Sequence, residues 1–342
     1  MKIETLNQLK NNHIVYFIYF LRKTKWRKLL SDLKYISQKN NQSQAGLFID
    51  VIKSSFIYGT SFHEYFYYSF YEKSHLQRQT YVTTAWMYEF QLRMNPKNTR
   101  SLVEDKLLFL NNYSELIGRA WFDINKSTED ELESFLHGKT KVVLKNSKGQ
   151  AGQNIKIINL EEYTPSALRS FASQNHFDLM EEYVYQHKSL MSLSPDSLNT
   201  LRIITQINNL DQVEIIGTIL RLGIGQETDN LSTGGIACPI DPVNGIVSGP
   251  GISFDITKED YYVHPINKKP LIGFKIPFWE ESISLVKKAA LMYPVNKSIG
   301  WDIAITDKGP ILIEGNHNWG VRLWQLPVKK GLKQILSKYI ND

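Results

Sequence analysis

Residues 300–316 place two apolar-patterned runs on either side of a short polar turn. The runs are 300–306 and 309–316, and the turn is Asp307-Lys308-Gly309. Apolar residues alternate with other residues along both runs, which is typical of two paired strands with one buried face each. The pattern therefore predicts a β-hairpin with alternating faces.

Three oxygen-bearing side chains stand near the open end of this predicted hairpin. Glu314 and Asn316 are two residues apart, so both leave the same face of their strand. Asp302 lies near the start of the other strand, where an antiparallel pairing brings it to them. Carboxylate and amide oxygens suit Mg²⁺, which proteins usually hold with few carboxylates plus substrate phosphates. On these residues alone, a solvated hairpin with ordinary polar ends is an equal alternative.

Length and composition indicate a globular protein. The chain has 342 residues, of which 42% are hydrophobic and 22% charged, as in globular proteins with a large core. A single cysteine, Cys238, excludes an intrachain disulfide framework and favours a reducing compartment. We interpret Cys238 as a small packed residue. The first apolar run, 14–21, is too short to span a bilayer, and no signal-peptide cleavage pattern follows it.

Basic residues are concentrated at the start of the chain. Residues 1–40 hold nine Lys and Arg against two acids, whereas the whole chain has a net charge of +6. The cluster 22–28 carries most of them, and aromatic and leucine residues flank it. Such a helix can be a solvated face, can rest on an anionic membrane surface, or can bind nucleic acid. We rank the solvated face first and nucleic acid last, since no zinc-ligand spacing or RNA-binding sheet motif is present.

The remaining patterns predict a helical leader followed by a mixed region. Residues 1–100 are expected to be helical, with an aromatic-rich core over 62–94. The turn 95–98 is a plausible boundary. We expect helices at 105–110, 129–137 and 278–292. We expect further strands at 141–145, 155–158, 179–185, 200–207 and 213–222.

A glycine-bearing loop lies between two of these strands. Lys145 ends the first strand, the polar loop 146–154 follows, and Lys106 stands at the beginning of the mixed region. Lysine ammonium groups and loop N–H groups suit phosphate oxygens. The loop is not a P-loop, because no helix follows it and the required spacing is absent. Either lysine taken alone is more simply explained as an exposed residue.

Further polar residues within apolar strands point to nucleotide and anion binding. In Glu181-Glu182-Tyr183-Val184, backbone groups and a carboxylate can read adenine or ribose; the alternative is an edge strand with exposed acids. Arg202 and Arg221 stand in apolar runs, where arginine needs an anionic partner, so we interpret them as an anion clamp. The loop 229–235 adds glycines that permit close backbone approach.

Taken in order, these residues resemble the ATP-grasp superfamily over about residues 100–320. The finer motifs Ser194-Pro195-Asp196-Ser197-Leu198-Asn199-Thr200-Leu201-Arg202, Gly300-Trp301-Asp302 and Ile313-Glu314-Gly315-Asn316 resemble its sugar-transfer-associated branch, which is related to α-L-glutamate ligases. That branch is associated with bacterial surface polysaccharides. Two features depart from many relatives: a basic helical region replaces an α/β domain, and an obvious ribose-binding acid is missing.

The resemblance implies an α+β fold in which two α/β subdomains grip ATP, preceded by a helical region. The implied divisions are 1–100, 101–180 and 181–342. The resemblance also assigns roles to individual residues. Those implied to bind ATP are Lys106, Lys145, Ser147, Gly149, Gly152, Glu181, Glu182, Tyr183, Val184 and His187, with 147–153 as a lid. Those implied to act on the transferring phosphoryl group or the substrate are Arg202, Arg221 and Asn230. Those implied to hold Mg²⁺ are Asp302, Glu314 and Asn316.

The implied activity is ATP-dependent ligation of a carboxylate and an amine through an acyl phosphate, with one substrate derived from a sugar. A sugar or small-molecule kinase and a non-catalytic ATP-binding scaffold are the alternatives. We expect a cytoplasmic protein that binds no nucleic acid, with residues 14–36 as the contact to a membrane or a glycosyltransferase. His317, Asn318 and Trp319 are further candidates for substrate contact.

Overall fold

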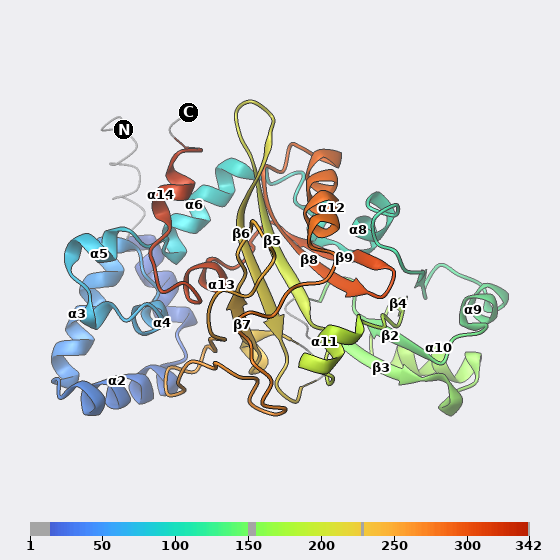
Figure 1. The fold of residues 1–342 in the computed structure, drawn as a ribbon, viewed down its shortest axis with the longest axis horizontal. Helices are drawn as coiled ribbons and strands as arrows, with labels where there is room; N and C mark the ends of the chain where they lie inside the picture. Colours follow the sequence, from blue (N-terminus) through green and yellow to red (C-terminus); the bar gives the residue numbers. More distant parts are fainter. Residues whose placement is uncertain (1–13, 150–154, 227–228, 341–342) are drawn as a thin grey trace.

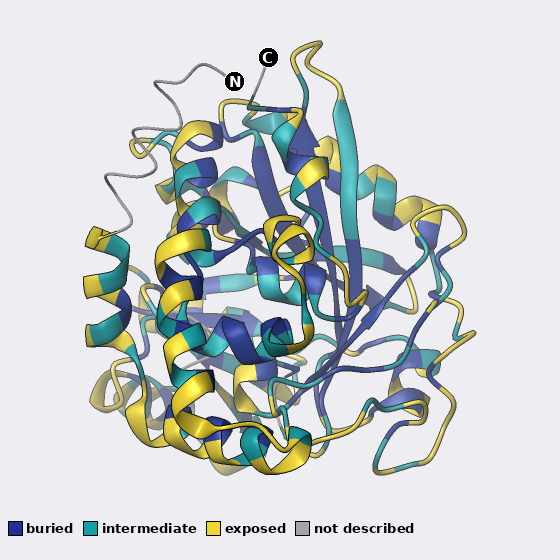
Figure 2. Ribbon diagram, turned by 90° about the vertical axis from the view of Figure 1, so that its left-hand side faces the viewer, coloured by how far each residue is buried: buried dark blue, intermediate teal, exposed yellow. Residues whose placement is uncertain are grey.

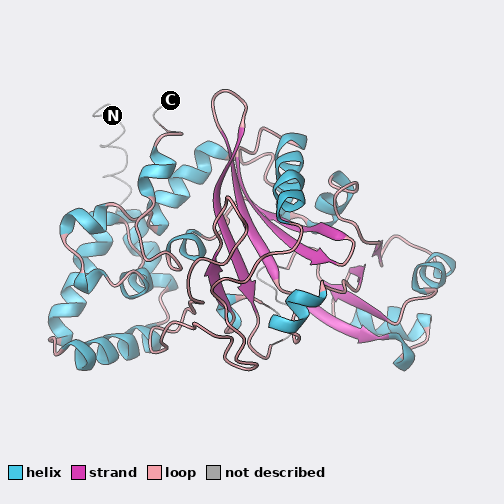
Figure 3. Cartoon of the chain, viewed as in Figure 1, coloured by secondary structure: helices cyan, strands magenta, loops and turns pink. Residues whose placement is uncertain are grey.

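The computed structural model describes residues 14–149, 155–226 and 229–340. Two antiparallel sheets lie side by side, and helices flank them on both sides (Figures 1 and 3). The five-stranded sheet has the order β7-β6-β5-β8-β9, and the four-stranded sheet has the order β1-β4-β2-β3. The predicted α+β organisation, with a helical region before the sheets, is confirmed.

The large sheet is the centre of the molecule. Its strands are β5 (Thr200–Ile207), β6 (Val213–Leu222), β7 (Ile236–Pro239), β8 (Ser298–Thr306) and β9 (Gly309–Asn316). Every residue of β5 is buried, because α12 covers one face of the sheet and N-terminal and C-terminal helices cover the other. The helices around it are α7 (Ser101–Glu104), α8 (Lys106–Asn112), α11 (Lys188–Leu193), η3 (Leu231–Thr233), α12 (Trp279–Met292), α13 (Val321–Gln325) and α14 (Lys333–Ser337).

The small sheet holds the predicted strand–loop–strand unit. Its strands are β1 (Trp121–Asp123), β2 (Lys141–Lys145), β3 (Ile155–Asn159) and β4 (Leu179–Glu182), and its helices are α9 (Glu129–Leu136), η2 (Leu160–Glu162) and α10 (Pro165–Gln174). β2 and β3 pair antiparallel over their full length, as the sequence predicts. Leu132 of α9 and Leu168 of α10 pack with Val142 and Leu144 of β2 in one core. A capping box at Thr128 starts α9.

The N-terminal region is helical where it is described. Residues 14–23 form a helix. The elements that follow are α2 (Trp26–Asn40), α3 (Gln44–Tyr58), α4 (Phe62–Tyr67), η1 (Phe70–Glu72), α5 (His75–Gln79) and α6 (Thr84–Met94). Most of these helices share a core of aromatic residues, whereas Phe90 of α6 packs with Ile204 and Ile219 of the large sheet. The region expected to end at residue 100 therefore shares a core with the sheet.

One predicted strand is too long. The pattern predicts a strand over 179–185, but β4 ends at Glu182. Residues 183–187 instead cross to the large sheet, where the His187 N–H donates to the Ile305 carbonyl at 2.7 Å. β4 also spans the expected division between 180 and 181, and it pairs with β1 and β2 on its two sides. The alternative of an edge strand is therefore wrong.

Candidate active site at the junction of the two sheets

The hairpin predicted at 300–316 is confirmed. β8 and β9 pair antiparallel, with Asp302 opposite Glu314 and Gly300 opposite Asn316. Gly309 in the turn has a φ of +124°, which glycine adopts without strain. A bulge follows Asp302, so that Ile303 pairs with Leu312 instead of Ile313. Bulges re-aim side chains, and this one lies where the polar residues cluster.

Asp302 is the centre of a buried charge cluster on the large sheet. Arg202 lies opposite it on β5, and its Nε and Nη2 donate to both carboxylate oxygens, the latter at 2.9 Å. Arg221 of β6 donates to Asp302 and to Asp229, in each case at 2.8 Å. Burial alone would raise the pKa of Asp302, but the two guanidinium groups lower it to about 2. The predicted pairing of both arginines with anions is thus present within the protein itself.

Glu314 sits in a different electrostatic position. Burial, and next the negative charge of Asp302, raise the pKa of Glu314 above its ordinary value. Asn316 donates to Glu314 at 3.1 Å, so the three predicted oxygen ligands are neighbours. A divalent cation would offset the repulsion between the two carboxylates, and the donor set of two carboxylates and one amide fits Mg²⁺. Among the described residues, no group of three or more His, Cys, Asp and Glu side chains is placed to hold a metal ion.

One of the two predicted phosphate lysines, Lys145, ends β2 of the small sheet, and the other, Lys106, begins α8, which packs against the large sheet. Asp105 caps α8 by accepting from the Leu107 and Leu108 N–H groups, which places Lys106 in the first turn. The Lys106 ammonium donates to the carbonyls of Asn146 and Ser147 at 3.2 and 3.4 Å and to that of Gly149. Burial lowers the pKa of Lys106, while the nearby charge of Glu314 opposes that shift. Because α8 also packs against β9, Lys106 lies between the glycine loop and the hairpin.

Lys145 binds Glu181 rather than lying exposed. Its Nζ is 2.8 Å from Oε2 of Glu181, and Nε of Arg119 is 2.7 Å from the same oxygen. Burial would raise the pKa of Glu181, but these two cations lower it to about 2. Glu182 accepts from the Ala120 N–H at 3.0 Å. Both acids predicted to read adenine or ribose thus have protein partners in this structure.

The remaining predicted ATP-binding residues lie around the same junction. Ser147 is anchored by Asp178, which accepts from its backbone N–H at 2.6 Å and from its hydroxyl at 2.5 Å. Tyr183 and Val184 lie in the segment that joins the two sheets, and Lys141 approaches the ring of Tyr183. His187 caps α11 by accepting from the Ser189 N–H at 3.1 Å. Gly152 lies outside the described residues, as does most of the predicted lid.

Asn230 starts the short helix η3, where its side chain accepts from the Ser232 N–H at 3.0 Å. Trp319 is fully buried, and its carbonyl accepts from Arg202 at 2.8 Å. Its indole N–H donates to the Ser298 hydroxyl at 3.0 Å and its ring packs edge-on against Trp324, so Trp319 is part of the core, and its contact with substrate stays a prediction. His317 lies 3.0 Å from Glu104, and Asn318 is exposed.

Sequence reasoning missed three residues that hold the site together: Arg119, Asp178 and Asp229. Arg119 precedes β1 and bonds to Glu181 of β4 and, at 2.7 Å, to the Leu312 carbonyl of β9. Asp229 bonds to Arg221 and to the Thr200 N–H. A signal for Asp229 was available, because it stands beside Asn230 in the polar loop. Arg119 and Asp178 have no readable pattern around them.

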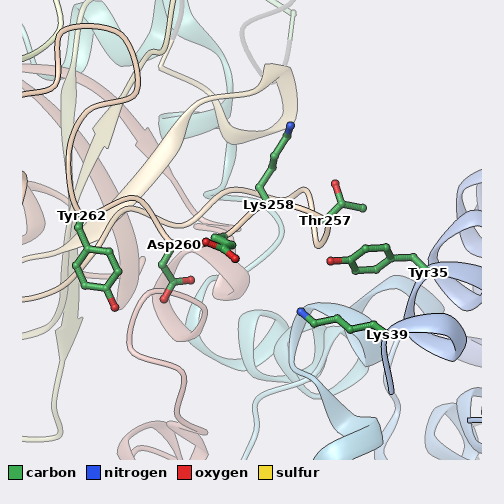
Figure 4. Close-up of a pocket in the computed structure, with 7 residues that line it drawn as sticks. Tyr35, Lys39, Thr257, Lys258, Asp260 and Tyr262 are labelled. Atoms are coloured by element: carbon green, nitrogen blue, oxygen red, sulfur yellow. The ribbon is translucent and has the colours of Figure 1, made fainter. Parts of the chain in front are cut away.

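A separate cleft of about 590 Å³ lies where α2 meets the loop 257–262. Figure 4 shows Tyr35 and Lys39 of α2 directed toward the loop that carries Lys258 and Asp260. Its lining residues are Tyr35, Lys39, Thr257, Lys258, Glu259, Asp260 and Tyr262. No predicted site residue within the described part of the chain lines this cleft, so it is distinct from the junction of the sheets.

The described part of the chain thus brings two antiparallel sheets together at a junction lined by charged residues. Comparison with protein families matches residues 86–341 to the family described as sugar-transfer associated ATP-grasp. The chain belongs to this family, and the resemblance inferred from its motifs is confirmed. A comparison with curated proteins gave no match.

Solved structures with a similar fold include three enzymes of different kinds. The ATP-grasp ligase PsnB, complexed with a precursor variant, Mg and ADP, matches with a TM-score of 0.45 and 10% identity, over 75% of this chain and 66% of its own. D-alanyl-alanine synthetase A from Vibrio cholerae matches with a TM-score of 0.41 and 10% identity, over 71% and 66%. The carboxyaminoimidazole ribonucleotide synthase from Aspergillus clavatus, complexed with ATP, matches with a TM-score of 0.43 and 13% identity, over 71% and 54%. The chain thus covers two thirds or less of each.

Proposed function

We propose that this protein is an ATP-dependent ligase that joins a carboxylate to an amine, one of them derived from a sugar, in bacterial surface polysaccharide assembly. Membership of the sugar-transfer associated ATP-grasp family supports the ATP site and the sugar connection. The observation that carries the proposal is that Lys106 begins α8, which packs against β9 with its Glu314, while the Lys106 ammonium donates to the carbonyls of Asn146 and Ser147 in the glycine loop. A phosphate chain bound there would have cations on one side and the oxygen ligands on the other.

Charge governs the proposed first step. An oxygen of the substrate carboxylate attacks the γ-phosphorus of ATP, the bond to the β-phosphate oxygen breaks, and ADP leaves with that electron pair. Two anions must approach each other, so Lys106, Lys145 and Arg221 would offset their repulsion and stabilise the transferring oxygens. Among the described residues the Nε–H of Arg221 is buried and has no acceptor, so this donor of the guanidinium group is available to a phosphate oxygen.

In the second step the amine nitrogen attacks the acyl carbon of the acyl phosphate. The carbon–oxygen bond to phosphate breaks, an amide forms, and the nitrogen loses a proton. No enzyme nucleophile is required. The thiol of Cys238 is unsuited to that role because it is fully buried, and burial raises its pKa to about 12. The buried thiol also fits the expected cytoplasmic location.

Asp302, Glu314 and Asn316 would hold Mg²⁺, whose chemistry is to neutralise phosphate charge and fix the nucleotide's orientation. In this structure Lys145 pairs with Glu181. We infer that Lys145 turns toward the phosphates when ATP binds and that Arg119 alone then holds the Glu181 carboxylate. Tyr183, Val184 and His187 would border the nucleoside, and Ser147 and Gly149 would begin the lid.

Turnover with pairs of substrates tests the reaction type. The full chain, ATP and Mg²⁺ are combined with each pairing of an amino acid and a uronic acid or amino sugar, and ADP, free phosphate and products are measured. A ligase releases ADP and phosphate only when both a carboxylate and an amine are present. A stable phosphorylated product formed without an amine would contradict ligation and support a kinase. ATP binding without turnover on any pair would support the scaffold.

A further inference from the structure

Large apolar side chains are exposed on three consecutive helices, namely residues 14–23, α2 and α3. Each is at least 39% exposed. We call this surface the N-terminal face, and its apolar members are Ile14, Val15, Ile18, Tyr19, Trp26, Leu30, Ile49, Phe56 and Ile57. Figure 2 views the side of the molecule formed by these helices, where their exposed turns point outward. Such a concentration differs from singly scattered surface apolar residues and indicates an interaction surface.

The exposed apolar residues recur at helical spacing on the sides of these helices that face away from the core. Ile14 and Ile18, like Trp26 and Leu30, are four residues apart and so share a helix face. The opposite sides of the same helices are already filled, for example by Phe20 and Leu29, which are at most 3% exposed. The rings of Phe17 and Phe56 stack at 4.1 Å, which joins the helix of residues 14–23 to α3.

The exposed charges between residues 14 and 58 are all basic. The only two acids there are occupied: Asp32 is buried beside Lys28 at 3.1 Å, and Asp50 accepts two bonds from Arg78 at 2.8 and 2.7 Å. The exposed basic residues are Arg22, Lys23, Lys25, Arg27, Lys34, Lys39 and Lys53. Apolar stripes bordered by one sign of charge match the anionic headgroup region of a bilayer.

We propose that the N-terminal face docks the protein onto an anionic lipid bilayer, lying on the surface without crossing it. The apolar and aromatic side chains would enter the boundary between headgroups and acyl chains, while the basic side chains would pair with lipid phosphates. Within the described residues no helix is long and apolar enough to cross a membrane. Nucleic acid fits less well, because it would leave the apolar stripes in water. The proposal does not depend on the reaction proposed above.

Vesicle flotation of the full chain tests the docking. We expect the protein to float with phosphatidylcholine vesicles that contain phosphatidylglycerol at low ionic strength, and to remain behind with pure phosphatidylcholine. High salt should release it. The variant Lys23→Glu/Lys25→Glu/Arg27→Glu should bind at least roughly tenfold more weakly, because each basic residue near such a surface adds several-fold to the affinity.

Two matched controls separate docking from general charge and hydrophobicity. Lys269→Glu/Lys275→Glu/Lys287→Glu makes the same charge change at exposed positions elsewhere and should float like the wild type. Ile14→Ser/Ile18→Ser should weaken binding, whereas Leu210→Ser/Val243→Ser, at positions 77% and 88% exposed, should not. Thermal melts of all variants verify that they remain folded.

Failure of the wild type to float with anionic vesicles would overturn the proposal, as would equal flotation of the two charge-reversal variants. Concentration-dependent self-association that Ile14→Ser/Ile18→Ser abolishes, without flotation, would instead make the face an interface between copies. ATP turnover measured in the same preparations distinguishes this failure from a failure of the ligase proposal.

Discussion

A single buried arginine connects the two sheets. The side chain of Arg119 is 2% exposed, and it donates to Glu181 of the small sheet and to the Leu312 and Ile313 carbonyls of β9. β9 carries Glu314, and β4 carries Glu181, which also binds Lys145. We infer that Arg119 sets the spacing between the phosphate lysines and the oxygen ligands.

Replacement of this arginine should be costly for folding. Arg119→Ala removes one cation from the buried Glu181 carboxylate and removes a donor from the carbonyls of Ile117, Leu312 and Ile313. We expect the free energy of unfolding to fall by about 3–5 kcal/mol. Urea unfolding followed by tryptophan fluorescence measures it. Lys126→Ala is the control, because Lys126 is 81% exposed and pairs with Asp123 at 3.3 Å; it should change stability by less than about 0.5 kcal/mol. Equal effects of both variants would contradict the assigned role.

Acid stability should depend on Glu181. Its pKa in the folded protein is about 2, below the ordinary value of 4.5. A carboxyl whose pKa is lowered by folding stabilises the protein above its unfolded pKa, and that contribution is lost as pH falls toward the folded value. Between about pH 5 and pH 2 the wild type should therefore lose on the order of 3 kcal/mol more than Glu181→Gln. Urea unfolding across this pH range measures the free energy of unfolding of both proteins. If it fell equally with pH in the wild type and in Glu181→Gln, the lowered pKa of Glu181 would be disproved.

At the scale of the element, the hairpin β8–β9 depends on close backbone approach. A Cβ at Gly300 would lie 2.3 Å from Cβ of Trp319 and 3.0 Å from Cδ of Arg202. Trp319 is fully buried, and its carbonyl binds Arg202. Because Gly300 has no side chain, Trp319 and Arg202 can pack directly against the backbone of β8.

Gly300→Ala should destabilise the protein by about 1–3 kcal/mol, because the added methyl group overpacks a filled site. Differential scanning calorimetry gives the change in melting temperature. Gly46→Ala is the matched control: it lies in α3, and its added Cβ would meet only Ser43, at 3.6 Å. There we expect stabilisation by about 0.5–1 kcal/mol, since alanine is the better helix former. If Gly300→Ala and Gly46→Ala changed the melting temperature in the same direction, overpacking at Gly300 would be refuted.

The sequence predicts elements well where alternation and turns are regular. The bounds expected for β2, β5 and β6 agree with the structure. β4 ends early because Tyr183, Val184 and Tyr185 favour strands by composition, while the tertiary structure uses them to cross between sheets. Arg119 was missed because its partners lie 62 and 193 residues away in the sequence. Local patterns carry no information on such pairs.

At the scale of the whole molecule, the helical N-terminal region and the large sheet form one packed body. Gln325 of α13 is fully buried, accepts from the Val82 N–H at 2.9 Å and donates to the Val82 carbonyl at 2.8 Å. Asn95 likewise bonds to the backbone of Ser298 at the start of β8. Docking of the N-terminal face on a bilayer would therefore fix the orientation of the large sheet as well.

The central claim is that ATP is held between Lys106 and Lys145 on one side and the hairpin ligands of the large sheet on the other. Isothermal titration of the full chain with ATP tests it most directly, with Mg²⁺ and with EDTA, for the wild type, Glu314→Gln and the exposed control Glu115→Gln. We predict saturable binding that weakens at least roughly tenfold in EDTA and in Glu314→Gln but not in Glu115→Gln, as expected when a cation ligand is lost. Equal ATP affinity of Glu314→Gln and the wild type in Mg²⁺ would contradict the account.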